Sequence, residues 1–143
     1  MSTQVAKTLQ ERIAEEAIGR VGKGYSGLCG DLVKDILSTH HINIPPGRRL
    51  RLVGREVPFE ERKTGDILFL YQDGKDYQKN VPFTAGILVE KKMYVSARSL
   101  IVSLTYFTVI PGATPRIHVP QGIYTHIGGY TEPNLFARVR RLE

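Results

Sequence analysis

The chain has 143 residues, enough for one domain with a buried core, and we treat residues 1–143 as a single domain. Hydrophobic residues make up 41% of the chain and charged residues 24%, values typical of globular rather than disordered proteins. One cysteine excludes a disulfide within the chain, and four scattered histidines do not form a metal-ligand pattern, so we expect no metal or other cofactor.

The net charge of +6 is concentrated in two segments, GRRLRLVGR at 47–55 and ARVRRL at 137–142. Such clusters attract polyanions, which makes nucleic-acid binding one hypothesis. Its candidate residues are Arg48, Arg49, Arg51, Arg55, Arg138, Arg140 and Arg141. We favour a solvated face with arginine stems over apolar surface, because neither interleaved aromatic residues nor helix-turn-helix spacing accompanies the charge.

No apolar run is long enough to cross a bilayer, so we expect no membrane span. The segment MSTQVAKTLQERIAEEAIGR alternates charged and apolar residues and does not read as a secretory signal. We therefore expect synthesis in the cytoplasm.

Apolar residues at four-residue steps predict a helix over 3–19, and glycines over 19–27 then predict a loop. A second, strongly apolar stripe predicts a buried helix that ends near His40 and His41. This stripe consists of Leu28, Leu32, Val33, Ile36 and Leu37.

The rest of the chain is expected to form mainly β-strands, joined by turns and loops. KTGD gives a turn, in which Asp66 is a hydrogen-bonding residue rather than a catalytic acid, and ILFLY after it suits a buried strand. QDGKDYQKN is expected as a polar loop, and FTAGILVE, KMYVSA and IVSLTYFTVI as consecutive antiparallel strands. Further strands are expected around 117–119 and 136–142. The order predicts an α+β fold with the amino-terminal helices packed on one face of an antiparallel sheet.

Cys29 lies where the second helix is expected to begin, and a helix amino terminus favours the thiolate form of cysteine. Asp31 works against this effect, since a second negative charge nearby disfavours ionisation. A histidine normally completes the activation of such a thiol. The position alone makes Cys29 a candidate nucleophile, and a buried structural cysteine is the alternative that we favour.

The order of motifs resembles the NlpC/P60 family of papain-like cysteine peptidases, which cut the peptide stems of bacterial peptidoglycan. LCGDLV at 28–33 is similar to the family's cysteine motif D-C-S-G-L-V, and KTGDILFLY to its P-G-D-L-V-F-F. TAGILVEKKMYVSA at 84–97 resembles its H-V-G-I-Y-L-G-N-G-x-h-I-H-A segment, and FARVRRL its closing A-R-R strand. The resemblance covers the chain from about residue 11 onward and implies the papain-like fold.

The chain departs from the family at the residues that perform catalysis. The resemblance places Thr84 where the family has its catalytic histidine, and Ser96 where a second histidine is usual. A threonine hydroxyl does not ionise near pH 7 and cannot act as the general base. The resemblance therefore implies a peptidase fold without its catalytic base, and we expect the chain not to be an enzyme.

The alternative is an active cysteine peptidase or amidase in which a displaced histidine, His126 or His118, activates Cys29. His40 and His41 are unsuitable, because they are expected at the far end of the second helix. Our favoured hypothesis is a catalytically degenerate NlpC/P60-like domain that binds other protein subunits in a phage tail or a similar cell-envelope-penetrating assembly. On this hypothesis the domain would be incorporated into a virion or injected particle and could contact peptidoglycan.

Overall fold

The structure is a computed structural model, and it describes residues 6–27, 29–44, 49–98, 100–119, 123–124, 130–131 and 134–142. Its α-helices are α1 (Leu9–Gly19), α2 (Cys29–Thr39) and α3 (Gly74–Lys79), and short 3-10 helices occupy Arg49–Leu52 and Phe59–Glu61. Thr8 caps α1 by accepting a hydrogen bond from Glu11 N, and the Glu11 side chain accepts one from Thr8 N. None of the described helices is long and apolar enough to span a membrane.

The main sheet has eight antiparallel strands. Seven of them follow the order β5-β4-β3-β2-β10-β7-β6, and β1 pairs with β10 beside them. Their bounds are β1 Arg55–Val57, β2 Ile67–Tyr71, β3 Thr84–Glu90, β4 Met93–Arg98, β5 Ile101–Tyr106, β6 Thr108–Ile110, β7 Arg116–His118 and β10 Asn134–Arg141. Strands β8 (Ile123–Tyr124) and β9 (Tyr130–Thr131) form a separate two-stranded sheet.

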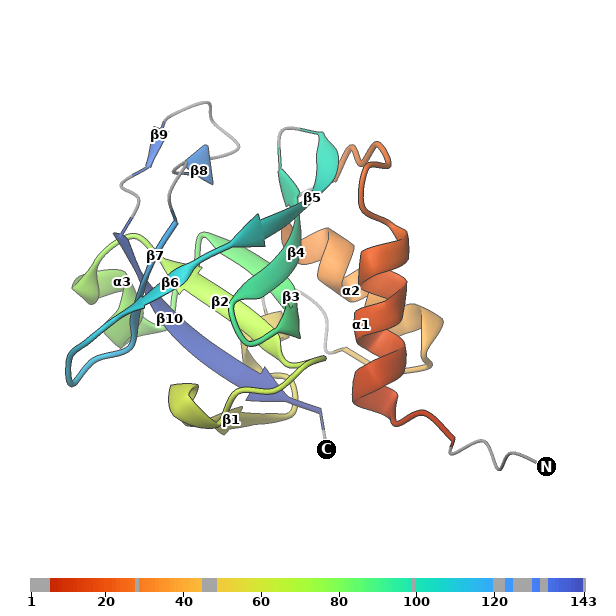
Figure 1. The fold of residues 1–143 in the computed structure, drawn as a ribbon, viewed down its shortest axis with the longest axis horizontal. Helices are drawn as coiled ribbons and strands as arrows, with labels where there is room; N and C mark the ends of the chain where they lie inside the picture. Colours follow the sequence, from red (N-terminus) through yellow and green to blue (C-terminus); the bar gives the residue numbers. More distant parts are fainter. Residues whose placement is uncertain are drawn as a thin grey trace.

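The sheet is curled into a half-barrel. β5 and β6 lie at opposite ends of the strand order, yet only Phe107 separates them in the chain. One continuous segment therefore pairs with β4 at one edge and with β7 at the other. Figure 1 shows this segment crossing the molecule, with α1 and α2 together on one side of the sheet.

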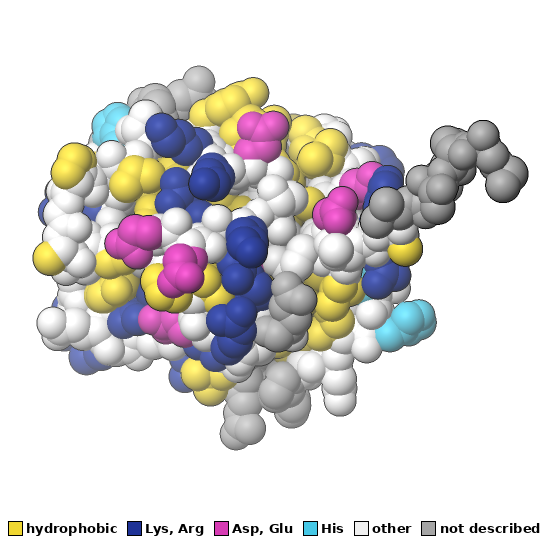
Figure 2. Space-filling model, turned by 60° about the horizontal axis from the view of Figure 1, so that its bottom comes forward, with side chains coloured by type: hydrophobic (Ala, Val, Ile, Leu, Met, Phe, Trp, Pro, Cys, Tyr) yellow, Lys and Arg dark blue, Asp and Glu magenta, His cyan; other side chains and the backbone are white. Residues whose placement is uncertain are grey.

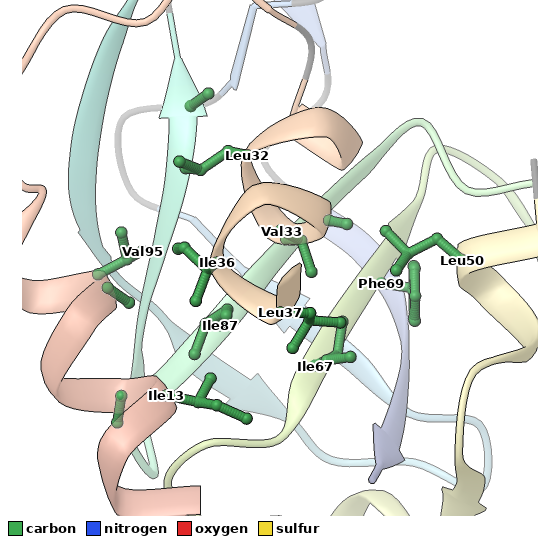
Figure 3. Close-up of a cluster of buried hydrophobic side chains, with 14 of the residues drawn as sticks. Ile13, Leu32, Val33, Ile36, Leu37, Leu50, Ile67, Phe69, Ile87 and Val95 are labelled. Carbon is green, nitrogen blue, oxygen red and sulfur yellow. The ribbon is translucent and has the colours of Figure 1, made fainter. Parts of the chain in front are cut away.

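Two hydrophobic clusters fill the two faces of the sheet. The outer cluster joins α1 and α2 to alternate residues of β2, β3 and β4, among them Phe69, Ile87 and Val95 (Figure 3). The inner cluster lies within the curl and contains the other alternate residues, such as Leu68, Leu88 and Tyr94. Because side chains alternate along a strand, the central strands are buried on both faces.

The α+β class and the packing of the amino-terminal helices on an antiparallel sheet agree with the prediction from the sequence. Two segments differ from the prediction: the first helix begins at Leu9 and not at residue 3, because Thr8 caps it, and the expected polar loop QDGKDYQKN contains helix α3. Asp73 caps this helix by accepting a hydrogen bond from Asp76 N, and Asn80 ends it in the left-handed conformation, with φ of 56°. Half-buried Tyr77 packs on Tyr71 and Phe136, and these ring contacts hold the short helix on the sheet.

Candidate functional site

Helix α2 begins at Cys29, as the sequence predicted, and packs on β3 and β4. The Cys29 side chain lies outside what the structure describes, and so does Leu28 before it. Around the helix start, the Tyr25 hydroxyl donates a 2.6 Å hydrogen bond to Oδ2 of Asp35. Burial and the Asp35 carboxylate together raise the pKa of Tyr25 above its ordinary value. This bond fixes the glycine-rich loop against the side of α2.

The part of the sheet that faces α2 is apolar. The described residues of β3 and β4 in the outer cluster are Ala85, Ile87, Val89, Met93, Val95 and Ala97. Opposite them, α2 contributes Leu32, Val33, Ile36 and Leu37, all with 0% exposure. Among the described side chains of these two strands, the helix therefore meets no imidazole, carboxylate or hydroxyl that could take a proton from a thiol.

Thr84 and Ser96 are buried on the other face of the sheet. Thr84 pairs with Leu70, which belongs to the inner cluster, whereas the next residue, Ala85, belongs to the outer cluster. Ser96 lies between Val95 and Ala97, both of the outer cluster, and therefore points into the curl as well. The two positions that match family histidines thus share a face with each other, but α2 covers the opposite face.

Gly86 lies between these positions, and the close packing around it explains why this residue is glycine. A Cβ at residue 86 would come within 2.7 Å of both Cδ2 of Tyr94 and the carbonyl oxygen of Val95, and 3.4 Å from Cβ of Ser96. The ring of Tyr94 occupies the space on the inner face. Gly86, the glycine of TAGILV, is therefore required for the close packing of β3 against Tyr94 and Val95.

The histidines are distributed over separate parts of the molecule. His118, on β7, places Nδ1 2.7 Å from Oδ1 of Asn134 at the start of β10. His40 lies at the end of α2, with Nε2 3.0 Å from Oε1 of Glu16 on α1. His126, the other candidate base, lies outside the described residues. Since β7 pairs with β6 and β10 while α2 packs on β3 and β4, the His118–Asn134 pair belongs to another part of the sheet.

A buried polar cluster forms around Asp66, which is 0% exposed. Its Oδ1 accepts hydrogen bonds from Nε of Arg141 (2.8 Å) and Nε2 of Gln10 (2.6 Å). Its Oδ2 accepts bonds from Nη2 of Arg141 and from Lys63 N, both at 2.8 Å. The Lys63 bond is the turn contact expected of Asp66; the others tie together β2, β10 and α1. The positive charge of Arg141 balances the negative charge of the Asp66 carboxylate, and these hydrogen bonds give Asp66 a structural role.

Sequence reasoning missed both partners of Asp66. Arg141 was grouped with the surface arginines, although it follows the buried residues Ala137 and Val139 at two-residue steps along β10. Gln10 was left out of the helical stripe, although it lies three residues before Ile13 on the buried side of α1. In each case the periodicity of the element carried the signal.

The other described arginines of β10 are engaged within the molecule. Arg138 donates to both carboxylate oxygens of Glu56 and to Tyr77 O, and its guanidinium lies 3.9 Å from the centroid of the Tyr77 ring. Arg140 donates to the carbonyl oxygens of Val53 (2.6 Å) and Gly54 (3.0 Å). Figure 2, which brings the bottom of Figure 1 forward, shows basic side chains beside acidic ones.

These contacts reduce the basic surface proposed for nucleic acid. Arg141 is buried against Asp66, and Arg138 and Arg140 hold the segment 53–56 and α3 against the sheet. Arg51 and Arg55 also have partners within the chain. Arg48 and the side chain of Arg49 lie outside the described residues. The C-terminal arginines thus act as stabilising contacts of the sheet, and Arg141 is unavailable to a polyanion.

A shallow hollow of about 410 Å³ lies between the start of α1 and the turn before β2. Its lining residues are Thr8, Gln10, Glu11, Arg62, Lys63, Thr64 and Lys91. None of them belongs to α2, so the hollow is separate from the Cys29 region. No group of three or more potential metal ligands occurs among the described residues.

Comparison of the chain with protein-family models, curated proteins and solved structures finds no match. The NlpC/P60 resemblance therefore rests on the short motifs of the sequence.

Proposed function

We propose that this chain is a non-catalytic, NlpC/P60-like domain that serves as a structural or binding component of a protein assembly. The observation that carries the proposal is the apolar surface opposite α2, where Ala85 and Ala97 belong to the same buried cluster as the helix that begins with Cys29. Thr84 and Ser96, which the motif alignment puts in the histidine positions, point into the curl instead.

Cleavage of a peptide by a cysteine requires two proton transfers. A base must take the thiol proton, and an acid must then give a proton to the leaving amine. The loss of such acid–base help lowers a rate by roughly 10²–10⁴. The helix terminus at Cys29 stabilises a thiolate but performs neither transfer, so a peptidase is the less favoured interpretation of this site.

The assembly that we propose is a phage tail or a similar machine that penetrates a bacterial cell envelope, and the motif order LCGDLV, KTGDILFLY and TAGILVE supports it. In such a machine the domain would contact other protein subunits and, at the envelope, peptidoglycan. An NlpC/P60-type groove without its base would bind a peptide stem without cutting it.

The proposal is tested by incubating the purified chain with peptidoglycan and separating the released fragments by mass spectrometry. We expect no release above that of a Cys29→Ala variant, and pull-down of intact peptidoglycan by both proteins to the same extent. Release of stem-peptide fragments by the wild-type chain that Cys29→Ala abolishes would overturn the proposal. Loss of that release in His118→Gln or His126→Gln would then identify the base.

A further inference from the structure

The hollow between the start of α1 and the turn before β2 is built from three segments that are fastened to one another. Gln10 Nε2 donates to Thr64 O (3.2 Å), which joins α1 to the turn. Arg62 Nε donates to Lys91 O (2.7 Å), which joins the turn to the β3–β4 hairpin. Gly65 lies so close to α1 that a Cβ at this residue would be 2.3 Å from Gln10 O. These contacts fix the shape of the hollow before any ligand binds.

Arg62 brings a positive charge to the hollow without a negative partner. It lines the hollow but is only 9% exposed. Its Nε and Nη1 donate to the carbonyl oxygens of Lys91 and Phe59, and the described residues provide neither an ion pair for Arg62 nor a hydrogen bond for its Nη2. Burial lowers the pKa of Arg62, and the Glu60 carboxylate offsets this effect only in part. A buried cation without a counter-charge is unfavourable, and a bound anion would supply that charge.

Two exposed lysines, Lys63 and Lys91, add to the positive charge of the lining. Within the part of the chain that the structure describes, neither forms an ion pair. The carboxylate of the lining belongs to Glu11, and its Oε1 accepts a hydrogen bond from Thr8 N in the cap of α1. Three cations and one carboxylate leave the hollow with a net charge of +2. This balance favours an anion over a cation as the ligand.

Neutral donors at the start of α1 accompany the cations. Thr8 Oγ1 accepts a hydrogen bond from Glu11 N, so the hydroxyl proton of Thr8 is available to a ligand. The N–H groups of Leu9 and Gln10 belong to the first turn of the helix, where the backbone offers them no acceptor. The positive end of the helix dipole therefore lies at the same hollow as the three cations.

We propose that this hollow binds a phosphate group, with Arg62, Lys63 and Lys91 supplying the positive charge. The donors approach from three segments, namely α1, the turn before β2 and the β3–β4 hairpin. A tetrahedral phosphate presents oxygens in all of these directions, whereas a planar carboxylate has only two oxygens. The volume of about 410 Å³ leaves room for a second phosphate or an organic group beside the first. This inference goes beyond the proposed function and is independent of it, because the hollow is separate from the Cys29 region.

The experiment adds inorganic pyrophosphate to the ¹⁵N-labelled chain and follows the amide resonances. The ionic strength is held at about 150 mM, so that long-range attraction between surface charges is screened. We expect saturable shifts at Gln10, Lys63 and Thr64. A parallel titration with acetate should show binding at least tenfold weaker.

Variants with matched charge distinguish a site from a general attraction of anions to a basic protein. Replacing Lys63 and Lys91 together by glutamine should weaken pyrophosphate binding at least tenfold. The control replaces Lys75 and Lys79 of α3 by glutamine; it makes the same change in net charge at exposed residues outside the hollow and should bind as the wild type does. Glu11→Gln removes the negative charge of the lining, keeps a side chain that can complete the cap, and should strengthen binding about threefold.

The source of the phosphate is tested by sedimentation with phosphatidylglycerol vesicles. Binding to vesicles that the double variant of Lys63 and Lys91 loses would identify a lipid headgroup, and absence of vesicle binding would identify a soluble phosphate compound.

Three results would overturn the inference. They are the absence of saturable shifts at the hollow with millimolar pyrophosphate, equal binding of acetate, and an equal loss of binding in the control variant of Lys75 and Lys79. Cleavage of peptidoglycan would refute the proposed function and leave the phosphate site unaffected, so the two failures are distinguishable.

Discussion

The carboxylate of Asp66 accepts two hydrogen bonds from the guanidinium of Arg141, each 2.8 Å long, in a region closed to solvent. Asp66 immediately precedes β2, and Arg141 ends β10, which lies beside β2 in the sheet. A third contact, from Gln10, joins α1 to the same carboxylate. The pair therefore fixes the carboxyl-terminal strand and the first helix to one point of the sheet.

Asp66→Asn should lower the free energy of unfolding by about 3–5 kcal/mol, because it removes the negative charge that faces the buried Arg141 guanidinium. Urea unfolding followed by circular dichroism measures the loss. The control is Glu56→Gln, which breaks the more exposed pair with Arg138 and should cost less than about 1 kcal/mol. Equal losses in the two variants would contradict the structural role given to Asp66.

Gly86→Ala should destabilise the chain by about 1–3 kcal/mol, because the added methyl group meets the Tyr94 ring and the Val95 carbonyl at 2.7 Å. Gly19→Ala is the matched control, since a Cβ at that helical position would meet no atom within 4 Å apart from its chain neighbours and the backbone of its own helix. It should be neutral or stabilising by up to about 1 kcal/mol. Thermal unfolding of both variants provides the comparison, and a neutral Gly86→Ala would refute the packing described.

Arg138→Gln should lower the free energy of unfolding by about 1–2 kcal/mol, because it removes charged hydrogen bonds to Glu56 and Tyr77 O and the contact with the Tyr77 ring. The matched change is Arg116→Gln, whose guanidinium lies 5.7 Å from the Phe136 ring centroid. We expect this second change to cost less than about 0.5 kcal/mol. The reverse order would show that the arginines of β10 are not structural contacts.

The folding stability of the chain should fall at alkaline pH because of the buried hydroxyl of Tyr71, which donates a 2.5 Å hydrogen bond to Asn80 Oδ1. Burial raises the pKa of Tyr71 above the ordinary tyrosine value of about 10. The folded state thus favours the neutral phenol, so its contribution is complete below about pH 10 and is lost as the pH rises further.

The measurement for Tyr71 is the urea midpoint at several pH values between 8 and 11. Tyr71→Phe should have a shallower alkaline loss of stability than the wild type, and part of the loss should remain because the pKa of Tyr25 is raised as well. Tyr106→Phe, at an exposed position, should keep the wild-type slope. Identical slopes for wild type and Tyr71→Phe would contradict the burial of this hydroxyl.

The sequence predicted the elements whose signal is local and strong. The spacing of Leu32, Val33, Ile36 and Leu37 identified a buried helix, and ILFLY identified β2. Helix α3 was missed because its six residues contain no apolar stripe. The helix depends instead on its caps and on the ring contacts of Tyr77, which residues distant in sequence provide.

The faces of β3 were beyond the reach of sequence reasoning for a physical reason. Alternation reveals the inner and outer faces of a strand only when one face meets water, and Thr84 to Val89 are buried on both sides. The motif could place Thr84 in the strand, but not on the face opposite α2. Likewise, the pairing of Asp66 with Arg141 depends on β10 inserting between β2 and β7, a contact across 75 residues.

The central claim is that no imidazole activates Cys29, and the rate of its alkylation by iodoacetamide between pH 5 and 9 tests this claim most directly. The account predicts slow alkylation throughout pH 5 to 7, without the fast phase near neutral pH that a thiolate paired with an imidazolium would show. The pH profile should be the same in His118→Gln and His126→Gln. Fast alkylation at pH 6 that either histidine variant abolishes would contradict the account.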